Sequence, residues 1–129
     1  MASVERFEDI EAWKRARQLT KAVCQVTAGG EFARDFTLRD QIRSAVVSIL
    51  SNIAEGFERG GDEEFRQLLS VAKGSAGEVR AQLYVALDAA LIDQQQFDRL
   101  YALTIEVAKL LSGFIRYLGS SGYKGNKFK

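Results

Sequence analysis

Residues 37–61 read TLRDQIRSAVVSILSNIAEGFERGG, a stretch with the pattern of one long amphipathic helix. Thr37 is the expected N-cap, with Asp40 three residues later in an approximate capping box, and Gly60 and Gly61 are the expected stop. Between these signals, apolar residues recur every three or four positions and share one helical face. The members of this face are Ile42, Val46, Ile49, Ile53 and Phe57. The stretch therefore predicts a long helix with one side in a hydrophobic core.

Three other segments have the same helical periodicity. The first covers residues 9–28, the third covers residues 62–90 and the fourth covers residues 93–118. Asp93 can cap the fourth helix while Gln96 completes a capping box. The chain contains no proline, which suits long uninterrupted helices.

Four amphipathic helices joined by short breaks pack most simply around a shared core. We therefore predict an all-α fold, an antiparallel up-down-up-down four-helix bundle, over residues 1–118. Residues 119–129 are rich in glycine, serine and lysine, and we predict a flexible basic tail there.

The composition limits the class of protein. At 129 residues and 47% hydrophobic content, the chain has enough apolar material for one domain. No apolar run suits a signal peptide or a membrane span, so we expect a cytoplasmic protein without membrane association. With 18 Lys and Arg against 17 Asp and Glu, any nucleic-acid site must be a local patch. The single Cys24 is most simply a buried or half-buried thiol.

The chain has no histidine, and this restricts its chemistry more than any other feature. Ser-His and Cys-His nucleophile pairs, most zinc sites and the Glu-x-x-His pattern of di-iron bundles all require histidine. We therefore predict that the protein is not an enzyme and needs no metal or cofactor. No small-molecule substrate is indicated.

Polar residues of the second and third helices form a candidate network beside the core. A carboxylate at Glu78 should have a donor from a neighbouring helix, and Arg43 and Arg59 are the candidates. Two interpretations stay open: an acid/base pair of Glu55 and Glu78, and a structural network that fixes helix register, which we favour. The network could lie within one subunit or between two. Its members are Arg43, Ser48, Asn52, Glu55, Arg59, Ser75 and Glu78.

Two glycines, Gly74 and Gly77, lie inside the third predicted helix. Each costs about 1 kcal/mol of helix stability relative to alanine, so another interaction should offset the cost. We expect close approach by another helix or room for Trp13, rather than a phosphate site, because phosphate loops place glycine before a helix.

Basic residues gather on the first helix and in the tail, where they could contact phosphates while aromatic side chains stack on bases. Solvated surface charge is the alternative for the first helix, because acidic residues such as Glu8 and Glu11 lie nearby. The candidate nucleic-acid contacts are Lys14, Arg17, Lys21, Tyr123, Lys124, Lys127 and Lys129.

Two blocks of sequence carry a family resemblance. Residues 41–56, QIRSAVVSILSNIAEG, resemble the central signature of the four-helix-bundle proteins named for the 23S rRNA intervening sequence that encodes some of them. Residues 64–78 are similar to the family's second signature helix, and Phe7-Glu8-Asp9 with Trp13 resembles its opening. The resemblance covers about residues 6–118.

The chain departs from the family pattern at three places. Ser44 stands where the family often has a second arginine, and the loop before the second helix lacks the usual proline. Ala89-Ala90 replaces a common turn of the Gly-Tyr type.

The resemblance implies a bacterial, non-catalytic protein that assembles as a closed homo-oligomer, a pentameric ring. The chain is also similar to the accessory protein of diversity-generating retroelements, which partners a reverse transcriptase and binds nucleic acid through a basic surface. Apolar residues cover well over half of the circumference of the fourth predicted helix, more than a peripheral bundle helix needs, and this also favours assembly. We predict an oligomeric scaffold with RNA or nucleoprotein as its candidate ligand. The alternative is an interaction module for a protein partner that does not bind nucleic acid.

Overall fold

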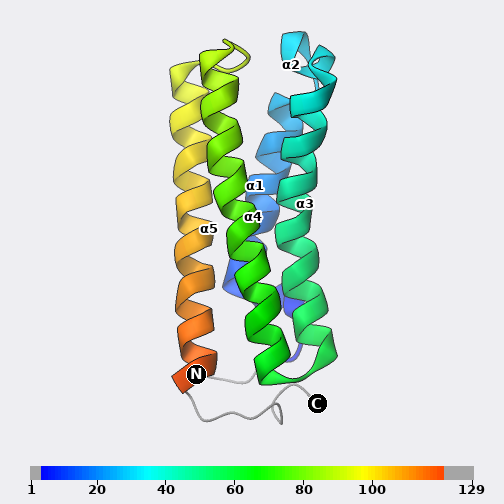
Figure 1. Cartoon of the computed structure of the whole chain (residues 1–129), viewed down its shortest axis with the longest axis vertical. Coiled ribbons are helices and arrows are strands. Elements are labelled where there is room, and N and C mark those ends of the chain that lie inside the picture. The colour runs from blue at the N-terminus through cyan, green and yellow to red at the C-terminus, as the bar shows by residue number, and fades with distance from the viewer. Residues whose placement is uncertain (1–3, 121–129) are drawn as a thin grey trace.

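The computed structural model describes residues 4–120, which form four long helices, one short helix and one 3-10 turn. The long helices run alternately up and down and pack side by side, which confirms the predicted helical bundle (Figure 1). Among residues 4–120, every helix is too short or too polar to cross a lipid bilayer. In chain order the elements are η1 Phe7–Asp9, α1 Glu11–Val26, α2 Gly30–Arg34, α3 Phe36–Arg59, α4 Asp62–Asp88 and α5 Gln94–Ser120.

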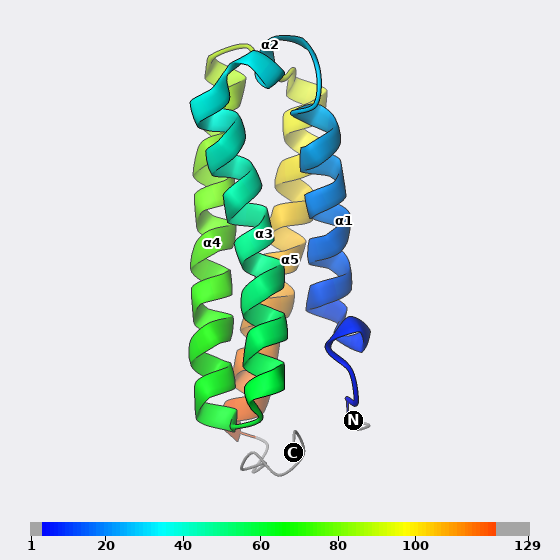
Figure 2. The same cartoon turned by 90° about the vertical axis from the view of Figure 1, so that its right-hand side faces the viewer.

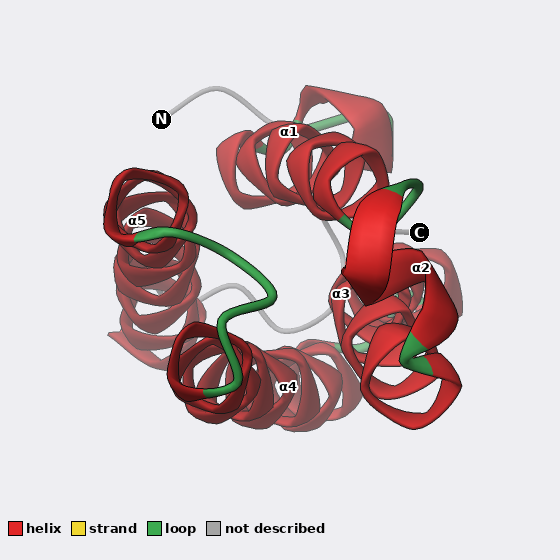
Figure 3. Ribbon diagram, turned by 90° about the horizontal axis from the view of Figure 1, so that it is seen from above, coloured by secondary structure: helices red, strands yellow, loops and turns green. Residues whose placement is uncertain are grey.

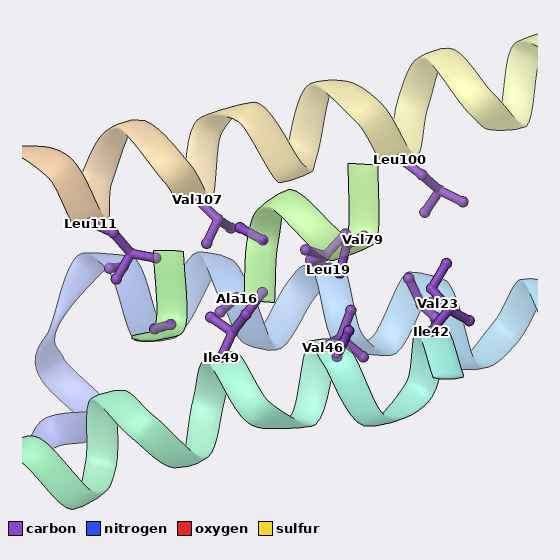
Figure 4. Close-up of a cluster of buried hydrophobic side chains, with 14 of the residues drawn as sticks. Ala16, Leu19, Val23, Ile42, Val46, Ile49, Val79, Leu100, Val107 and Leu111 are labelled. Carbon is purple, nitrogen blue, oxygen red and sulfur yellow. The ribbon is translucent and has the colours of Figure 1, made fainter. Parts of the chain in front are cut away.

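Each long helix occupies one corner of the bundle when it is seen from above (Figure 3). α3 packs against α1 and α4, and α5 packs against α4 and α1, so neighbours in sequence are neighbours in space. The five predicted core residues of residues 37–61 are all buried. They meet side chains such as Leu19 of α1, Val79 of α4 and Val107 of α5 in one continuous core (Figure 4). Each fully buried side chain of this size contributes about 1.5–3 kcal/mol through the hydrophobic effect.

The start of α3 differs from the prediction. Asp35 is the N-cap, because its Oδ1 accepts a hydrogen bond of 3.2 Å from the backbone N–H of Leu38, whereas Thr37 lies within the first turn. The short helix α2 was not predicted either. It lies across the end of the bundle next to α3, where Phe32 is 2% exposed (Figure 2). Asp35 therefore ends α2 and caps α3 at once, which leaves no room for a long loop.

Gly60 and Gly61 end α3 as predicted, and Gly60 has a left-handed φ of 86°. α3 and α4 approach each other closely just before the turn that joins them. A Cβ atom at Gly56 would lie 2.7 Å from Cδ1 of Phe65, closer than a real contact allows. The absence of a side chain at Gly56 therefore permits this approach.

The break between α4 and α5 contains the predicted capping box. The backbone N–H of Gln96 donates to Oδ1 of Asp93 at 2.7 Å, and the N–H of Asp93 donates to Oε1 of Gln96 at 2.9 Å. Ala90 adopts a left-handed φ of 59° at this turn. α5 continues to Ser120, two residues beyond the predicted end.

α1 is much shorter than the other long helices, with 16 residues against 27 in α5. At 1.5 Å per residue it spans about 24 Å, whereas α5 spans about 40 Å. Among residues 4–120, η1 and the chain around it take the place of a helix beyond the N-terminal end of α1 (Figure 2). An apolar cavity of about 450 Å³ lies there, lined by Val4, Ile10, Leu110, Phe114 and Tyr117 among others.

Candidate assembly surface and nucleic-acid contacts

The predicted polar network is split into separate groups. One group joins α3 to α4: the hydroxyls of Ser48 and Ser75 lie 2.9 Å apart, and Nδ2 of Asn52 donates to Oγ of Ser48 at 3.0 Å and to its carbonyl at 2.8 Å. Ser75 is 6% exposed. These bonds satisfy polar groups at the helix contact, which is the structural role predicted for these three residues.

A second group lies at the α3–α4 turn. Arg59 donates to the carboxylates of Glu55 and Glu64, and all three side chains are about half exposed. Hydrogen bonds to Glu64 and then Glu55 raise the pKa of the Arg59 guanidinium above its usual value. Glu64 was missed in the sequence, although it follows Arg59 by only five residues across a glycine turn. Because the group is exposed to solvent, its contribution to stability is small.

Arg43 has a different role from the predicted one. Its Nε donates to Oγ1 of Thr27 at 2.8 Å, and its Nη2 donates to the carbonyl of Cys24 at 3.2 Å. Thr27 is 1% exposed and is the C-cap of α1. Arg43 therefore satisfies the end of α1 from α3, and it is not the partner of Glu78.

Glu78 is exposed, and neither Arg43 nor Arg59 binds it, so the predicted buried carboxylate is wrong for a single chain. The acid/base pair is wrong as well. Ser48 and Ser75 lie opposite each other, and Glu55 is seven residues from Ser48 toward the α3–α4 turn, whereas Glu78 is three residues from Ser75 away from it. Ten residues of helix separate the two carboxylates by about 15 Å along the axis.

Glu78 instead borders a groove of about 560 Å³ between α3 and α4, together with Asp40, Ser44 and Gln82. The Oε1 atom of Gln82 is buried there without a hydrogen-bond partner among residues 4–120.

The solvent side of α4 has a second helical stripe, which we call the outer seam of α4. Its positions alternate at spacings of four and three, the spacing by which helices pack on other helices. Every position is exposed, and Val71 and Val85 are 51% and 53% exposed. The outer seam of α4 consists of Gln67, Val71, Gly74, Glu78, Ala81 and Val85.

The two glycines of α4 do not serve the purpose expected of them within one chain. A Cβ atom at Gly74 or at Gly77 would meet no other atom within 4 Å. Trp13 packs instead against Phe7, with ring centroids 5.2 Å apart. No contact among residues 4–120 therefore offsets the cost of these glycines.

α3 has an outer seam of its own, again with spacings of four and three. Its middle positions are small or apolar, and Val47 is 50% exposed. Its two ends are acidic. The outer seam of α3 consists of Asp40, Ser44, Val47, Ser51, Ala54 and Glu58.

The basic residues of α1 gather on its solvent side. Lys14, Arg17 and Lys21 line a shallow groove of about 580 Å³ together with Arg6 and Trp13. Lys14 lies 3.6 Å from Glu11, whereas Arg17 and Lys21 have no ion pair among residues 4–120. Two cations are thus available for an external anion. The other candidate contacts, Tyr123, Lys124, Lys127 and Lys129, lie outside the described residues.

Residues 4–120 contain no group of three or more Cys, Asp or Glu side chains arranged to bind a metal ion. Cys24 is half buried, in agreement with its expected structural position.

Comparisons with other proteins give a family and a fold. Residues 8–113 match the family model described as 23S rRNA-intervening sequence protein. The fold is similar to the 1.70 Å crystal structure of a protein with unknown function from the S23 ribosomal protein family of Bacteroides thetaiotaomicron. That match has a TM-score of 0.74 at 19% identity and covers 81% of this chain and 98% of the other. No curated protein matches the chain. The resemblance to the retroelement accessory protein stays a prediction.

Proposed function

Because the chain belongs to the 23S rRNA-intervening sequence protein family, we propose that it is a non-catalytic scaffold that assembles with copies of itself. The proposed assembly is a closed ring, five-membered as the family resemblance implies. The observation that carries the proposal is the outer seam of α4, with half-exposed Val71 and Val85 and a glycine between them.

A helix on the surface of a single bundle needs only one apolar stripe, because its other face is solvated. α4 buries one stripe in the core and still presents a second, in which Glu78 is the only charge. Small residues such as Gly74 and Ala81 would let a second helix approach at the lower end of the usual interaxial distance of about 8–10 Å. Docking would therefore cover the valines and offset the cost of the glycines.

The chemistry of the chain supports a non-catalytic role. Histidine is absent from the sequence, and the two carboxylates considered as an acid/base pair are separated along the bundle. A general acid and base must both reach the reacting group, which this separation prevents. The polar residues between α3 and α4 bond to one another instead.

The mass of the protein in solution tests the assembly. Light scattering across a micromolar concentration series should give a multiple of the 14.3 kDa chain mass. The double variant Val71→Lys, Val85→Lys should give the monomer mass with unchanged helical circular dichroism. Ala102→Lys, at an exposed position of α5, is the control and should assemble normally. A wild-type monomer at every concentration would refute the proposal.

A second candidate function is binding of RNA through phosphate contacts on α1. The observation in its favour is that Arg17 and Lys21 have no ion pair within the described part of the chain and lie beside a groove that Trp13 also lines. One copy with a net charge of +1 should bind weakly, but a ring would present several such faces. Linked weak sites raise overall affinity by about two to four orders of magnitude.

Fluorescence anisotropy with single-stranded and structured RNA across a salt series tests this function. Arg17→Glu, Lys21→Glu should weaken binding, whereas Arg99→Glu, an exposed charge on α5, should change it little. Phosphate contacts should also make binding fall steeply with salt. Deletion of residues 121–129 separates the contribution of the tail. If no form binds RNA at low salt, the protein-partner module becomes the better interpretation.

A further inference from the structure

We infer that the ring is built head to tail, with the outer seam of α4 of one copy packed on the outer seam of α3 of the next. The inference rests on the proposed assembly and names its two surfaces. Among residues 4–120, three of the five exposed large apolar side chains lie in these seams, Val47 in that of α3 and Val71 and Val85 in that of α4; the other two are Phe36 and Tyr84. No large apolar side chain of α5 belongs to this exposed group, and those at its surface, such as Leu103 and Ile115, are partly buried against the core.

Symmetry requires two different surfaces. A surface that packs on its own copy makes a two-fold dimer and stops, whereas a ring of more than two members needs two complementary surfaces on each copy. The two outer seams meet this requirement, since each has six positions at the same alternating spacing. α3 and α4 occupy neighbouring corners of the bundle (Figure 3). Their outward faces therefore point in different directions, so successive contacts turn and can close.

Charge selects the same pairing. Two copies of the α3 seam packed on each other would place the acidic ends Asp40 and Glu58 against acidic ends, whether the helices ran parallel or antiparallel. Two copies of the α4 seam packed on each other would place Glu78 of one chain against or beside Glu78 of the other. When an α3 seam faces an α4 seam end to end, these three acids meet uncharged residues in either direction. Like charges that face each other oppose association, so the mixed pairing is the one free of repulsion within the seams.

Side-chain size fits this pairing as well. In a ring whose axis runs along the bundles, all copies point the same way, and α3 and α4 run in opposite directions within each copy, so the two seams would meet antiparallel. Aligned end to end, Ser51 then lies opposite Gly74 and Ser44 opposite Ala81. Small residues thus oppose small residues at these two pairs, and Val47 lies opposite Glu78 between them. The Ser51–Gly74 pair permits the close helix contact that Gly74 provides for.

Two single variants, alone and mixed, test the inference. Ser51→Arg blocks the seam of α3, and Gly74→Arg blocks the seam of α4 without an internal clash, because the space beyond Gly74 is open. Each variant alone should scatter light as a monomer with full helical dichroism. Mixed in equal amounts, they should form a species of two chains and nothing larger, because one intact seam remains on each. Ala102→Arg is the matched control and should assemble like the wild type.

Other outcomes would overturn the inference. If Ser51→Arg assembles normally, the α3 seam is not used, and if only Gly74→Arg is monomeric, α4 packs on its own copy. Two monomeric variants that do not combine would exclude head-to-tail contact. A wild-type protein that is itself a monomer would instead refute the assembly on which the inference rests, so the two failures are distinguishable.

Discussion

The two faces of α4 have the same spacing and opposite surroundings. The inner face carries Phe65, Leu69, Val79 and Leu83, each 0% exposed, and the outer seam carries Val71 and Val85, each about half exposed. A three-four spacing marks a face that can pack on a helix, but it does not say which helix supplies the partner. A second stripe at this spacing therefore indicates a partner outside the chain only when another stripe of the same helix already forms the core.

The largest expected difference between the two faces is in core packing. Leu83→Ala should lower the free energy of unfolding by about 2–5 kcal/mol, because it removes buried contacts and leaves a cavity. Val85→Ala, on the outer seam, should change it by about 0.5 kcal/mol or less in a monomeric background. Urea unfolding of both variants in the Gly74→Arg background, which is expected to be monomeric, measures the difference. Equal effects would mean that the outer seam is packed within the chain.

The glycines of the bundle also differ in whether their surroundings are packed or open. Gly56→Ala should cost about 1–3 kcal/mol, because the new Cβ atom would overlap the buried ring of Phe65. Gly77→Ala, with open space around it, is the matched control and should not destabilise the fold. Thermal unfolding distinguishes the two. A neutral Gly56→Ala variant would show that the Phe65 ring can move aside.

A smaller and opposite effect is expected at the outer seam. Gly74→Ala should raise the free energy of unfolding of a monomeric variant by about 0.5–1 kcal/mol, because alanine favours the helix and meets no clash. In the assembling protein the same change should not add to the stability of the oligomer. The comparison uses urea unfolding in the Val71→Lys, Val85→Lys background. A loss of stability there would show that Gly74 has a contact inside the chain.

The smallest effect on the monomer should be that of Glu78→Ala. Because Glu78 is exposed and neither candidate arginine binds it, the change should stay within about 0.5 kcal/mol. Ser75→Ala, on the α3-facing side of the same helix, should cost about 0.5–1.5 kcal/mol through loss of the bond to Ser48. Thermal melts of both variants check the order. A larger loss of stability for Glu78→Ala would support the buried network that includes Glu78.

Much of the fold could be predicted from the sequence because the signals are local. The apolar stripe of residues 37–61 repeats every three or four residues, and the capping box joins Asp93 to Gln96 within one turn. α2 and the N-cap at Asp35 were missed because a five-residue helix has too few turns to show periodicity. Gly29 and Gly30, at the start of α2, also resemble an ordinary loop boundary.

The candidate sites were harder to predict, because partners that are distant in sequence decide them. Arg43 was assigned to Glu78 on grounds of charge, whereas its donors satisfy the end of α1, 16 residues earlier in the chain. Ser48, Asn52 and Ser75 were grouped correctly because they face the α3–α4 contact. The role of Gly74 could not be predicted from the sequence, because it depends on the open space that the fold leaves beside this residue.

The short α1 gives the bundle a weak end. Among residues 4–120, no helix continues α1 before Glu11; η1 contacts α3 there, and a cavity lies between the chain around η1 and the end of α5. Local opening costs least where few apolar contacts must break, so this end should open without unfolding of the whole bundle. Amide hydrogens in the last two turns of α5 should therefore exchange with solvent faster than those near Val107, and hydrogen-exchange mass spectrometry can compare them. The bundle would then open from the end where the chain begins and α5 finishes.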